Sequence, residues 1–283
     1  MSVTDRPTRT RIHGQTAAPP ERSAGAWSVP EFAADVLRPR RSRYAACLFV
    51  INEGERLLRQ LAQMLEIEHG LDVIIADGGS TDGSMELRRL ESLGVHAVLV
   101  KHGEGKLSAQ MRMALAWCLR EAYEGVVVMD GNGKDGPEAL PRFVAALDAG
   151  FDHVQGSRFV PGGEAVNTPL WRYLGIKLLH APLISLASGR RYTDTTNGFR
   201  AYSRRLLLDP RVAPFRDVFS KYELHYYFAI RAARLGMRVC EVPVRRAYPA
   251  TGKTPTKIRG WRGNTLIMAT LLRACLGRYN PSP

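Results

Sequence analysis

Carboxylates, amides and glycines follow three short apolar segments of the sequence. The segments end, in order, on Asn52-Glu53, on Asp77-Gly78-Gly79-Ser80-Thr81-Asp82, and on Asp130-Gly131-Asn132-Gly133-Lys134. A carboxylate at the end of a buried strand loses hydration unless a partner compensates it. Its oxygens suit a hard cation such as Mg²⁺, and glycines let the backbone approach a ligand closely. These residues indicate a polar ligand site, although Thr81 and Ser84 would serve equally well as helix N-caps.

The elements that must position these residues alternate along the chain. Short apolar runs predict strands at Tyr44–Ile51, Leu71–Ala76, Ala97–Val100, Val126–Met129 and His153–Gln155. Helical spacing of apolar residues predicts helices at Glu55–Glu66, Ser84–Leu93, Leu107–Glu124 and Glu138–Leu147. Strands that alternate with helices predict an α/β fold with a mainly parallel sheet and helices on both faces. Ligands bind beyond the carboxyl ends of such strands, which is where the polar residues stand.

The composition is that of a globular protein with an excess of positive charge. The 283 residues are 45% hydrophobic and 24% charged, and the formal net charge is +13. Such an excess points to an anionic partner, and from Val242 to Pro283 there are eight Lys and Arg and no acid. No nucleic-acid-binding motif is present and the acids gather at strand ends, so nucleic acid is not expected as the partner. The four cysteines lack CxxC spacing and predict free thiols.

Three regions are expected along the chain. Residues 1–43, rich in Arg, Pro, Ala, Thr and Ser, predict a disordered basic arm with a short helix around Val29 to Leu37. Residues 44–258 form a single α/β domain, and residues 259–283 form a basic amphipathic helix and tail. No run of about 18 apolar residues exists, so no membrane-spanning helix is expected. The N-terminus also lacks the apolar segment of a secretory signal.

Several motifs in a fixed order carry a family resemblance. They are Val50-Ile51-Asn52-Glu53, Asp77 to Ser84, Asp130-Gly131-Asn132 with Pro137-Glu138, Gly156-Ser157-Arg158-Phe159 with Gly162-Gly163, Asp194 to Arg200, Glu241-Val242-Pro243-Val244, and Gly252-Lys253 with Lys257. From Tyr44 to Ile258 the chain resembles inverting family-2 glycosyltransferases of the GT-A fold. Among them it is most similar to the dolichyl- or polyprenyl-phosphate sugar synthases. The resemblance implies a Rossmann-like, mainly parallel sheet in one catalytic domain, and a sugar nucleotide as the donor.

The resemblance also assigns donor-binding residues. Those that it places at the nucleotide sugar are Asn52, Glu53, Asp77, Asp82, Lys253 and Lys257. Asp77 would contact the base, Asp82 would support that loop, and the two lysines would bind phosphate.

The segment after the fourth strand departs from the family pattern. The synthases typically show Asp-x-Asp-x-Gln there, where a divalent cation binds the donor diphosphate, but this chain shows Asp130-x-Asn132-x-Lys134. A protonated lysine cannot ligate a metal. Either Asp130, Asn132 and Asp135 hold a weakly bound Mg²⁺ or Mn²⁺, which we favour, or Lys134 partly replaces the metal as the cation that faces the diphosphate. A third reading makes Lys134 a solvent-exposed loop residue.

Inverting transfer is a single displacement at the anomeric carbon of the sugar. The enzyme must align donor and acceptor and neutralise the charge that grows on the leaving diphosphate. The resemblance implies this second task for Arg158, and Lys134 is placed to share it. A lipid-phosphate acceptor is already anionic and needs no strong base, whereas a hydroxyl acceptor would need Asp194 to take its proton. Asp194 could also be a turn or N-cap acid, but the family position favours a role in the site.

The sequence thus predicts an enzyme that moves a sugar from a nucleotide-diphosphate donor to a polyprenyl-phosphate-type acceptor. Two alternatives stay open: the same donor with a hydroxyl acceptor on a sugar or small natural product, and a catalytically weak sugar-nucleotide-binding protein. The basic C-terminal region predicts contact with an anionic membrane, and the equal alternative is that the apolar side of its helix packs on the catalytic domain while its arginines face water. The expected location is therefore cytoplasmic, peripheral on the inner face of the membrane.

Overall fold

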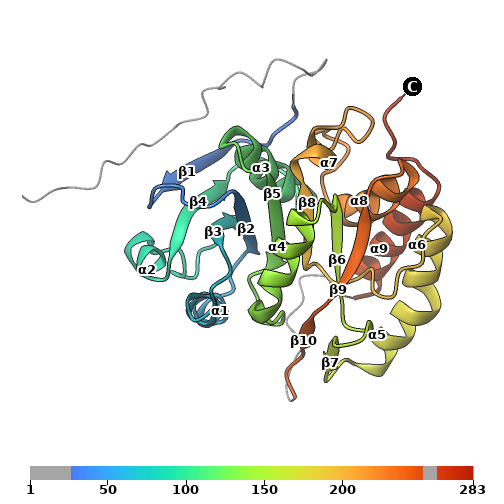
Figure 1. The fold of residues 1–283 in the computed structure, drawn as a ribbon, viewed down its shortest axis with the longest axis horizontal. Helices are drawn as coiled ribbons and strands as arrows, with labels where there is room; N and C mark the ends of the chain where they lie inside the picture. The colour runs from blue at the N-terminus through green and yellow to red at the C-terminus, as the bar shows by residue number, and fades with distance from the viewer. Residues whose placement is uncertain (1–26, 251–259, 283) are drawn as a thin grey trace, which may run out of the picture.

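Ten strands run through the part of the chain that the computed structural model describes, residues 27–250 and 260–282 (Figure 1). They are β1 (Phe32–Val36), β2 (Tyr44–Val50), β3 (Leu71–Asp77), β4 (Val95–Lys101), β5 (Gly125–Asp130), β6 (His153–Ser157), β7 (Glu164–Val166), β8 (Arg200–Ser203), β9 (Val239–Pro243) and β10 (Arg245–Ala247). Eight of them form one sheet in the order β1-β4-β3-β2-β5-β8-β6-β9, and β7 pairs with β10 apart from it. The five predicted strands are confirmed as β2 to β6.

Helices alternate with the early strands as predicted. They are α1 (Glu55–Leu65), α2 (Leu87–Ser92), α3 (Leu107–Arg120), the 3₁₀ turn η1 (Pro137–Ala139), α4 (Leu140–Asp148), α5 (Leu170–Gly175), the π-helical turn η2 (Ile176–His180), α6 (Ala181–Ser188), α7 (Arg204–Leu208), α8 (Glu223–Arg234) and α9 (Gly260–Cys275). The helix predicted to begin at Ser84 begins instead at Leu87, as α2. Glu86 is its N-cap, and the Glu86 carboxylate accepts the N–H groups of Arg88 and Arg89.

The strand directions bring the polar loops to one edge of the sheet. β2 lies between β3 and β5 and is parallel to both, so that Val50 pairs with Asp77 and Phe49 with Asp130. β8 is antiparallel to both β5 and β6, and β1 is antiparallel to β4. The carboxyl ends of β2, β3 and β5 are therefore adjacent, which is the place where open parallel sheets bind ligands. The predicted α/β, mainly parallel fold is confirmed.

Two layers of helices cover the sheet (Figure 1). α1, α2 and α4 pack on one face, and α3, α6, α8 and α9 pack on the other. In β2, Ala45, Cys47 and Phe49 belong to one core and their neighbours to the other. Burial on both faces explains why the central strands read as continuous apolar runs instead of alternating ones. All four cysteines are free, as predicted.

The prediction of a helix around Val29 to Leu37 is wrong. This segment carries β1, which pairs with β4 from Phe32 opposite Lys101 to Val36 opposite Ala97. Residues 27–43 are thus ordered instead of part of a disordered arm, and residues 1–26 lie outside the described residues. The ring of Trp27 also stacks on Phe215, with 4.2 Å between centroids. The spacing of apolar residues in this segment also suits a helix. A strand forms instead because it can pair with the free main-chain N–H and C=O groups at the edge of β4, which a helix cannot do.

A helix lies in the C-terminal region where one was predicted, but its apolar side is used within the protein. Leu271 and Ala274 of α9 are buried in the same core as residues of α6 and α8. Leu272 on the same helix remains 47% exposed. Within the described ranges, no helix is long and apolar enough to cross a membrane.

Candidate active site

The loops after β2 and β3 form one hydrogen-bonded unit. Asn52 Oδ1 accepts the N–H of Thr81 at 2.8 Å, and the Ser80 hydroxyl accepts the N–H of Asn52 at 2.9 Å. Asp82 Oδ2 accepts the N–H of Gly54 at 2.8 Å. Asn52 has a φ of 50°, in the left-handed region that asparagine tolerates better than most residues. Two of the predicted nucleotide-binding residues, Asn52 and Asp82, therefore lie together and hold the shape of this rim.

Asp77 and Glu53 are buried beneath the same rim. Asp77 accepts hydrogen bonds from the N–H of Gly79 and from both the N–H and the hydroxyl of Ser80. Glu53 forms an ion pair with Arg56 at 2.8 Å. Asp77 thus orders its own loop, and its contact with a nucleotide base stays a prediction.

The loop after β5 is anchored to α1 by Gln60. The buried Gln60 amide donates to the carbonyl of Asp130 at 3.1 Å and accepts the N–H of Gly133 at 2.8 Å. Asn132 Nδ2 donates to Asp130 Oδ2 at 3.2 Å. Lys134 is only 9% exposed, so its interpretation as a solvent-exposed loop residue is wrong. The loop is a fixed part of the site.

Arg246 of β10 joins the two acids of this loop. Its Nη1 lies 2.6 Å from both carboxylate oxygens of Asp135, and its Nη2 lies 3.1 Å from Asp130 Oδ2. Burial alone would lower the pKa of Arg246, but Asp135 and Asp130 outweigh it and raise that pKa. The guanidinium is therefore a permanent cation between two carboxylates.

The predicted metal ligands Asp130, Asn132 and Asp135 do not fit a metal site as they lie. Arg246 contacts both oxygens of Asp135 and one oxygen of Asp130, and the amide nitrogen of Asn132 contacts that same Asp130 oxygen. Burial raises the pKa of Asp135, and although burial acts the same way on Asp130, Arg246 and Lys134 outweigh it there and lower the pKa. In the described part of the chain, no group of three His, Cys, Asp or Glu could hold a metal ion.

Arg158 and Asp194 form a buried, two-pronged ion pair. Arg158 Nε donates to one carboxylate oxygen at 2.6 Å and Nη2 to the other at 2.9 Å. Burial would raise the pKa of Asp194, but Arg158 lowers it overall, which makes Asp194 a weak proton acceptor. Arg158 Nη1 is buried without a hydrogen-bond partner among the described residues, which leaves one of its donors unused within the protein. As it lies, Asp194 positions Arg158, and its role as a base stays a prediction.

Cations surround the ring of Tyr248. Lys134 Nζ lies 5.7 Å from the ring centroid, and the guanidinium carbons of Arg172 and Arg246 lie 5.5 and 6.0 Å from it. Burial would raise the pKa of Tyr248, but Arg246, Arg172 and Arg158 together lower it. This cationic cluster is a place of positive potential suited to a phosphate-bearing ligand.

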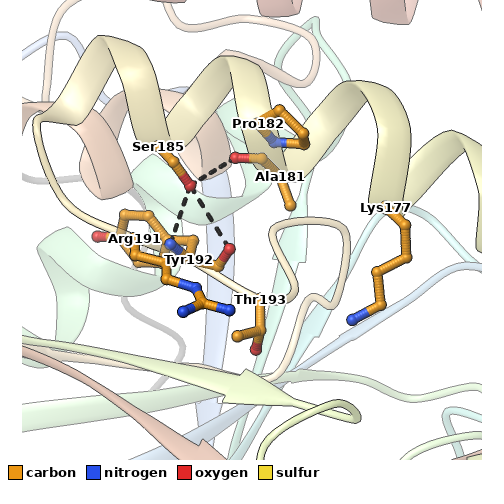
Figure 2. Close-up of a pocket in the computed structure, with 7 residues that line it drawn as sticks. All are labelled: Lys177, Ala181, Pro182, Ser185, Arg191, Tyr192 and Thr193. Carbon is orange, nitrogen blue, oxygen red and sulfur yellow. Dashed lines mark hydrogen bonds between the residues drawn. The ribbon is translucent and has the colours of Figure 1, made fainter.

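A pocket of about 280 Å³ lies against Thr193, the residue before Asp194 (Figure 2). It is lined by Lys177, Ala181, Pro182, Ser185, Arg191, Tyr192 and Thr193. The Thr193 hydroxyl bonds the Ser157 hydroxyl at 2.6 Å, which ties the pocket wall to the residue before Arg158. Burial lowers the pKa of Lys177, and Asp194 and Glu241 act against this shift. The cations Lys177 and Arg191 can bind a phosphate group in this pocket, and Ala181 and Pro182 give it an apolar wall.

Several site residues were not foreseen from the sequence. They are Gln60, Lys177, Arg191, Arg246 and Tyr248. A signal existed only for Arg246, as a charge within a strand-like segment directly after Glu241-Val242-Pro243-Val244. Conversely, the predicted Lys253 and Lys257 lie outside the described residues.

Comparison with known proteins places this site in a family. The model for glycosyl transferase family 2 matches residues 46–209, which is more than half of the chain. The chain belongs to glycosyl transferase family 2. It is 34% identical over 197 residues to an undecaprenyl-phosphate mannosyltransferase of Micrococcus luteus, covering 68% of this chain and 79% of that protein. It is 31% identical over 234 residues to a polyprenol monophosphomannose synthase of Mycolicibacterium smegmatis, covering 81% and 84%. The predicted family and the predicted glycosyltransferase activity are confirmed.

Solved structures agree on the fold. Glucosyl-3-phosphoglycerate synthase from Mycobacterium tuberculosis, in complex with Mn²⁺, UDP and phosphoglyceric acid, gives a TM-score of 0.58 at 20% identity. The match covers 86% of this chain and 80% of that chain. This similarity confirms the GT-A-like α/β fold, and the Mn²⁺ belongs to that enzyme.

Proposed function

We propose that this family-2 glycosyltransferase moves a sugar from a nucleotide diphosphate to a polyprenyl-phosphate-type acceptor, with inversion at the anomeric carbon. The observation that carries the proposal is the pocket that Lys177 and Arg191 line, next to consecutive helices that carry a set of exposed apolar side chains, called here the apolar face. The face consists of Leu170, Trp171, Leu174, Leu178, Leu179 and Leu186, on α5, η2 and α6. An acceptor phosphate fits the cations, and a prenyl chain fits the apolar face.

The residues divide the work of a single displacement. The rim of Asn52 and Asp82 binds the nucleotide, and Arg158 and Lys134 neutralise the diphosphate as it leaves. Lys177 and Arg191 hold the acceptor phosphate in line with the anomeric carbon. The attacking phosphate oxygen is already anionic, so no base needs to take a proton, which agrees with an Asp194 occupied by Arg158.

The same apolar face supports a peripheral place on a membrane, and the cytoplasmic side is part of the proposal. Leu178 and Leu186 are 73% and 79% exposed, and a monomeric soluble protein seldom gathers such residues without a partner. Trp171 suits the headgroup region of a bilayer. A lipid acceptor would then reach the pocket from the surface on which the enzyme lies.

Turnover tests the proposed function. UDP- and GDP-linked sugars are incubated with the full-length protein and a polyprenyl phosphate, and mass spectrometry follows the glycosylated lipid. We expect a sugar phosphate lipid and free nucleoside diphosphate. Lys177→Met should lower the apparent affinity for the lipid about tenfold, the effect of one charge-assisted contact. Product on a hydroxyl acceptor alone, with none on the lipid phosphate, would overturn the proposal.

A further inference from the structure

The loop after β5 is joined to β10 through main-chain hydrogen bonds. The N–H of Gly136 donates to the carbonyl of Arg245 at 3.0 Å, and the N–H of Ala247 donates to the carbonyl of Lys134 at 2.8 Å. Asp135 and Arg246 are paired between these two bonds. These bonds therefore hold the main chain of Lys134 and of Arg246 side by side at the carboxyl end of β5.

Arg246 binds the carboxylates that a divalent cation at this site would need as ligands. Both Asp135 oxygens lie 2.6 Å from its Nη1, and Arg246 is 6% exposed. Mg²⁺ and Mn²⁺ prefer oxygen ligands, and here both oxygens of Asp135 and one oxygen of Asp130 are already bound by a guanidinium. A metal could enter only by displacing a buried ion pair, which leaves an uncompensated charge.

The charges at the carboxyl end of β5 balance without a metal. Two carboxylates, Asp130 and Asp135, face two cations, Arg246 and Lys134. A pair of carboxylates with one divalent cation has the same net charge of zero. Around Tyr248, Arg172 adds a further positive charge within 5.5 Å of the ring centroid. The site therefore offers a diphosphate at least the positive charge of a metal-loaded pair of acids.

We propose that Arg246 replaces the divalent cation in this enzyme, so that the donor diphosphate binds to Lys134 and the cations around Tyr248 with no metal ion. The inference rests on the proposed nucleotide-diphosphate donor. Relative to the Asp-x-Asp-x-Gln pattern of the synthases, Asn132 and Lys134 would then belong to one change. Side chains that could bind a metal are replaced, and cations take over the binding of the diphosphate.

Binding to the full-length, EDTA-treated protein tests this. Calorimetry measures the Kd of UDP and of GDP in EDTA and again with Mn²⁺, and electron paramagnetic resonance measures Mn²⁺ bound in the presence of each nucleotide. We expect one nucleotide to bind with a Kd that changes less than about threefold between the two conditions, since it gains no metal contact. We also expect no protein-bound Mn²⁺. Binding that requires Mn²⁺ would overturn the inference and leave the donor assignment standing, whereas no binding under either condition would overturn both.

A matched pair of variants separates Arg246 from general charge. Arg246→Met should weaken nucleotide binding in EDTA about tenfold or more, the effect of a lost charge. Mn²⁺ should restore part of it, because Asp130 and Asp135 become free. Arg245→Met, next on the strand and 3.3 Å from the exposed Glu164, should change binding less than about twofold. Unchanged binding in a folded Arg246→Met would contradict the inference, and if that variant fails to fold, the wild-type measurements decide alone.

Discussion

At the scale of single residues, Asp194 acts by holding Arg158 in place. Both side chains are buried, with exposures of 0% and 1%, and each satisfies the other's charge. Breaking a buried ion pair from one side leaves a charge without compensation, which costs about 3–5 kcal/mol. The pair is thus an all-or-none unit that fixes the Arg158 guanidinium.

A double-mutant cycle checks this unit. Asp194→Asn and Arg158→Met should each lower the free energy of unfolding by about 3 kcal/mol, and the double variant should be no worse than either single one. Urea unfolding measures all three. Asp209→Asn is the control, since its partner Arg211 is 60% exposed, and it should cost less than about 1 kcal/mol. Additive losses in the double variant would show that the two residues act independently.

At the scale of elements, the donor rim depends on the bonds between the loops after β2 and β3. Asn52 carries two demands at once, a left-handed backbone and an acceptor for the N–H of Thr81. Alanine meets neither demand, whereas aspartate tolerates the same backbone and keeps an acceptor oxygen.

Asn52→Ala should therefore loosen the rim, and Asn52→Asp should not. We expect the alanine variant to lose about 1–2 kcal/mol of local stability and to bind nucleotide about tenfold more weakly. Hydrogen exchange at the Thr81 amide and calorimetry with UDP and GDP measure the two effects. Equal protection of Thr81 in the wild type and the alanine variant would mean that the loops are held by other contacts.

Predictability from the sequence also follows the elements. The strands β2, β3 and β5, which lead to Asn52, Asp77 and Asp130, were predicted because burial on both faces leaves an unbroken apolar run. β10 was missed because it has three residues, two of them arginines, and Arg246 meets Asp135 across 111 positions of chain. β1 was mistaken for a helix because an edge pairing overrode its local spacing. The local sequence pattern predicted which residues lie at the carboxyl edge of the sheet. The partner of Asp130 and Asp135 could not be predicted, because Arg246 reaches them only through long-range pairing.

At the scale of the whole molecule, Asp152 links three segments and makes the fold sensitive to acid. Its carboxylate accepts hydrogen bonds from Arg205, Ser203 and the N–H of Arg238. Burial would raise the pKa of Asp152, but these bonds outweigh it and lower the pKa below the ordinary 3.8. A lowered pKa in the folded state stabilises the protein above the unfolded value, and this contribution fades as pH falls through the folded value.

Thermal unfolding between pH 7 and pH 3 measures that contribution. Asp152→Asn should lower the Tm at pH 7 by several degrees, the shift expected for a loss on the order of 1 kcal/mol. The gap between the variant and the wild type should narrow below about pH 4, where Asp152 begins to protonate in the unfolded state while it stays ionised in the folded one. A gap that stays constant down to pH 3 would assign the loss to packing instead of charge.

The protein combines a net charge of +13 with the exposed apolar face on α5, η2 and α6. Each basic residue near an anionic bilayer contributes about 1 kcal/mol, and the leucines add burial in the interface. The C-terminal helix was the expected contact, but Leu271 and Ala274 of α9 lie in the core, so truncating it would damage the fold. The apolar face is therefore the surface to test.

Vesicle sedimentation tests membrane binding with the fold left intact. Full-length protein should pellet with anionic vesicles and stay in solution with neutral ones, and high salt should release most of it. Leu178→Asp with Leu186→Asp should reduce pelleting about tenfold or more, because two apolar contacts become charges that the bilayer repels. Val36→Asp with Leu65→Asp is the matched control, since these residues are 47% and 54% exposed on other elements, and it should pellet like the wild type. If both double variants pellet equally, the apolar face does not meet the membrane, and charge elsewhere on the protein holds it there.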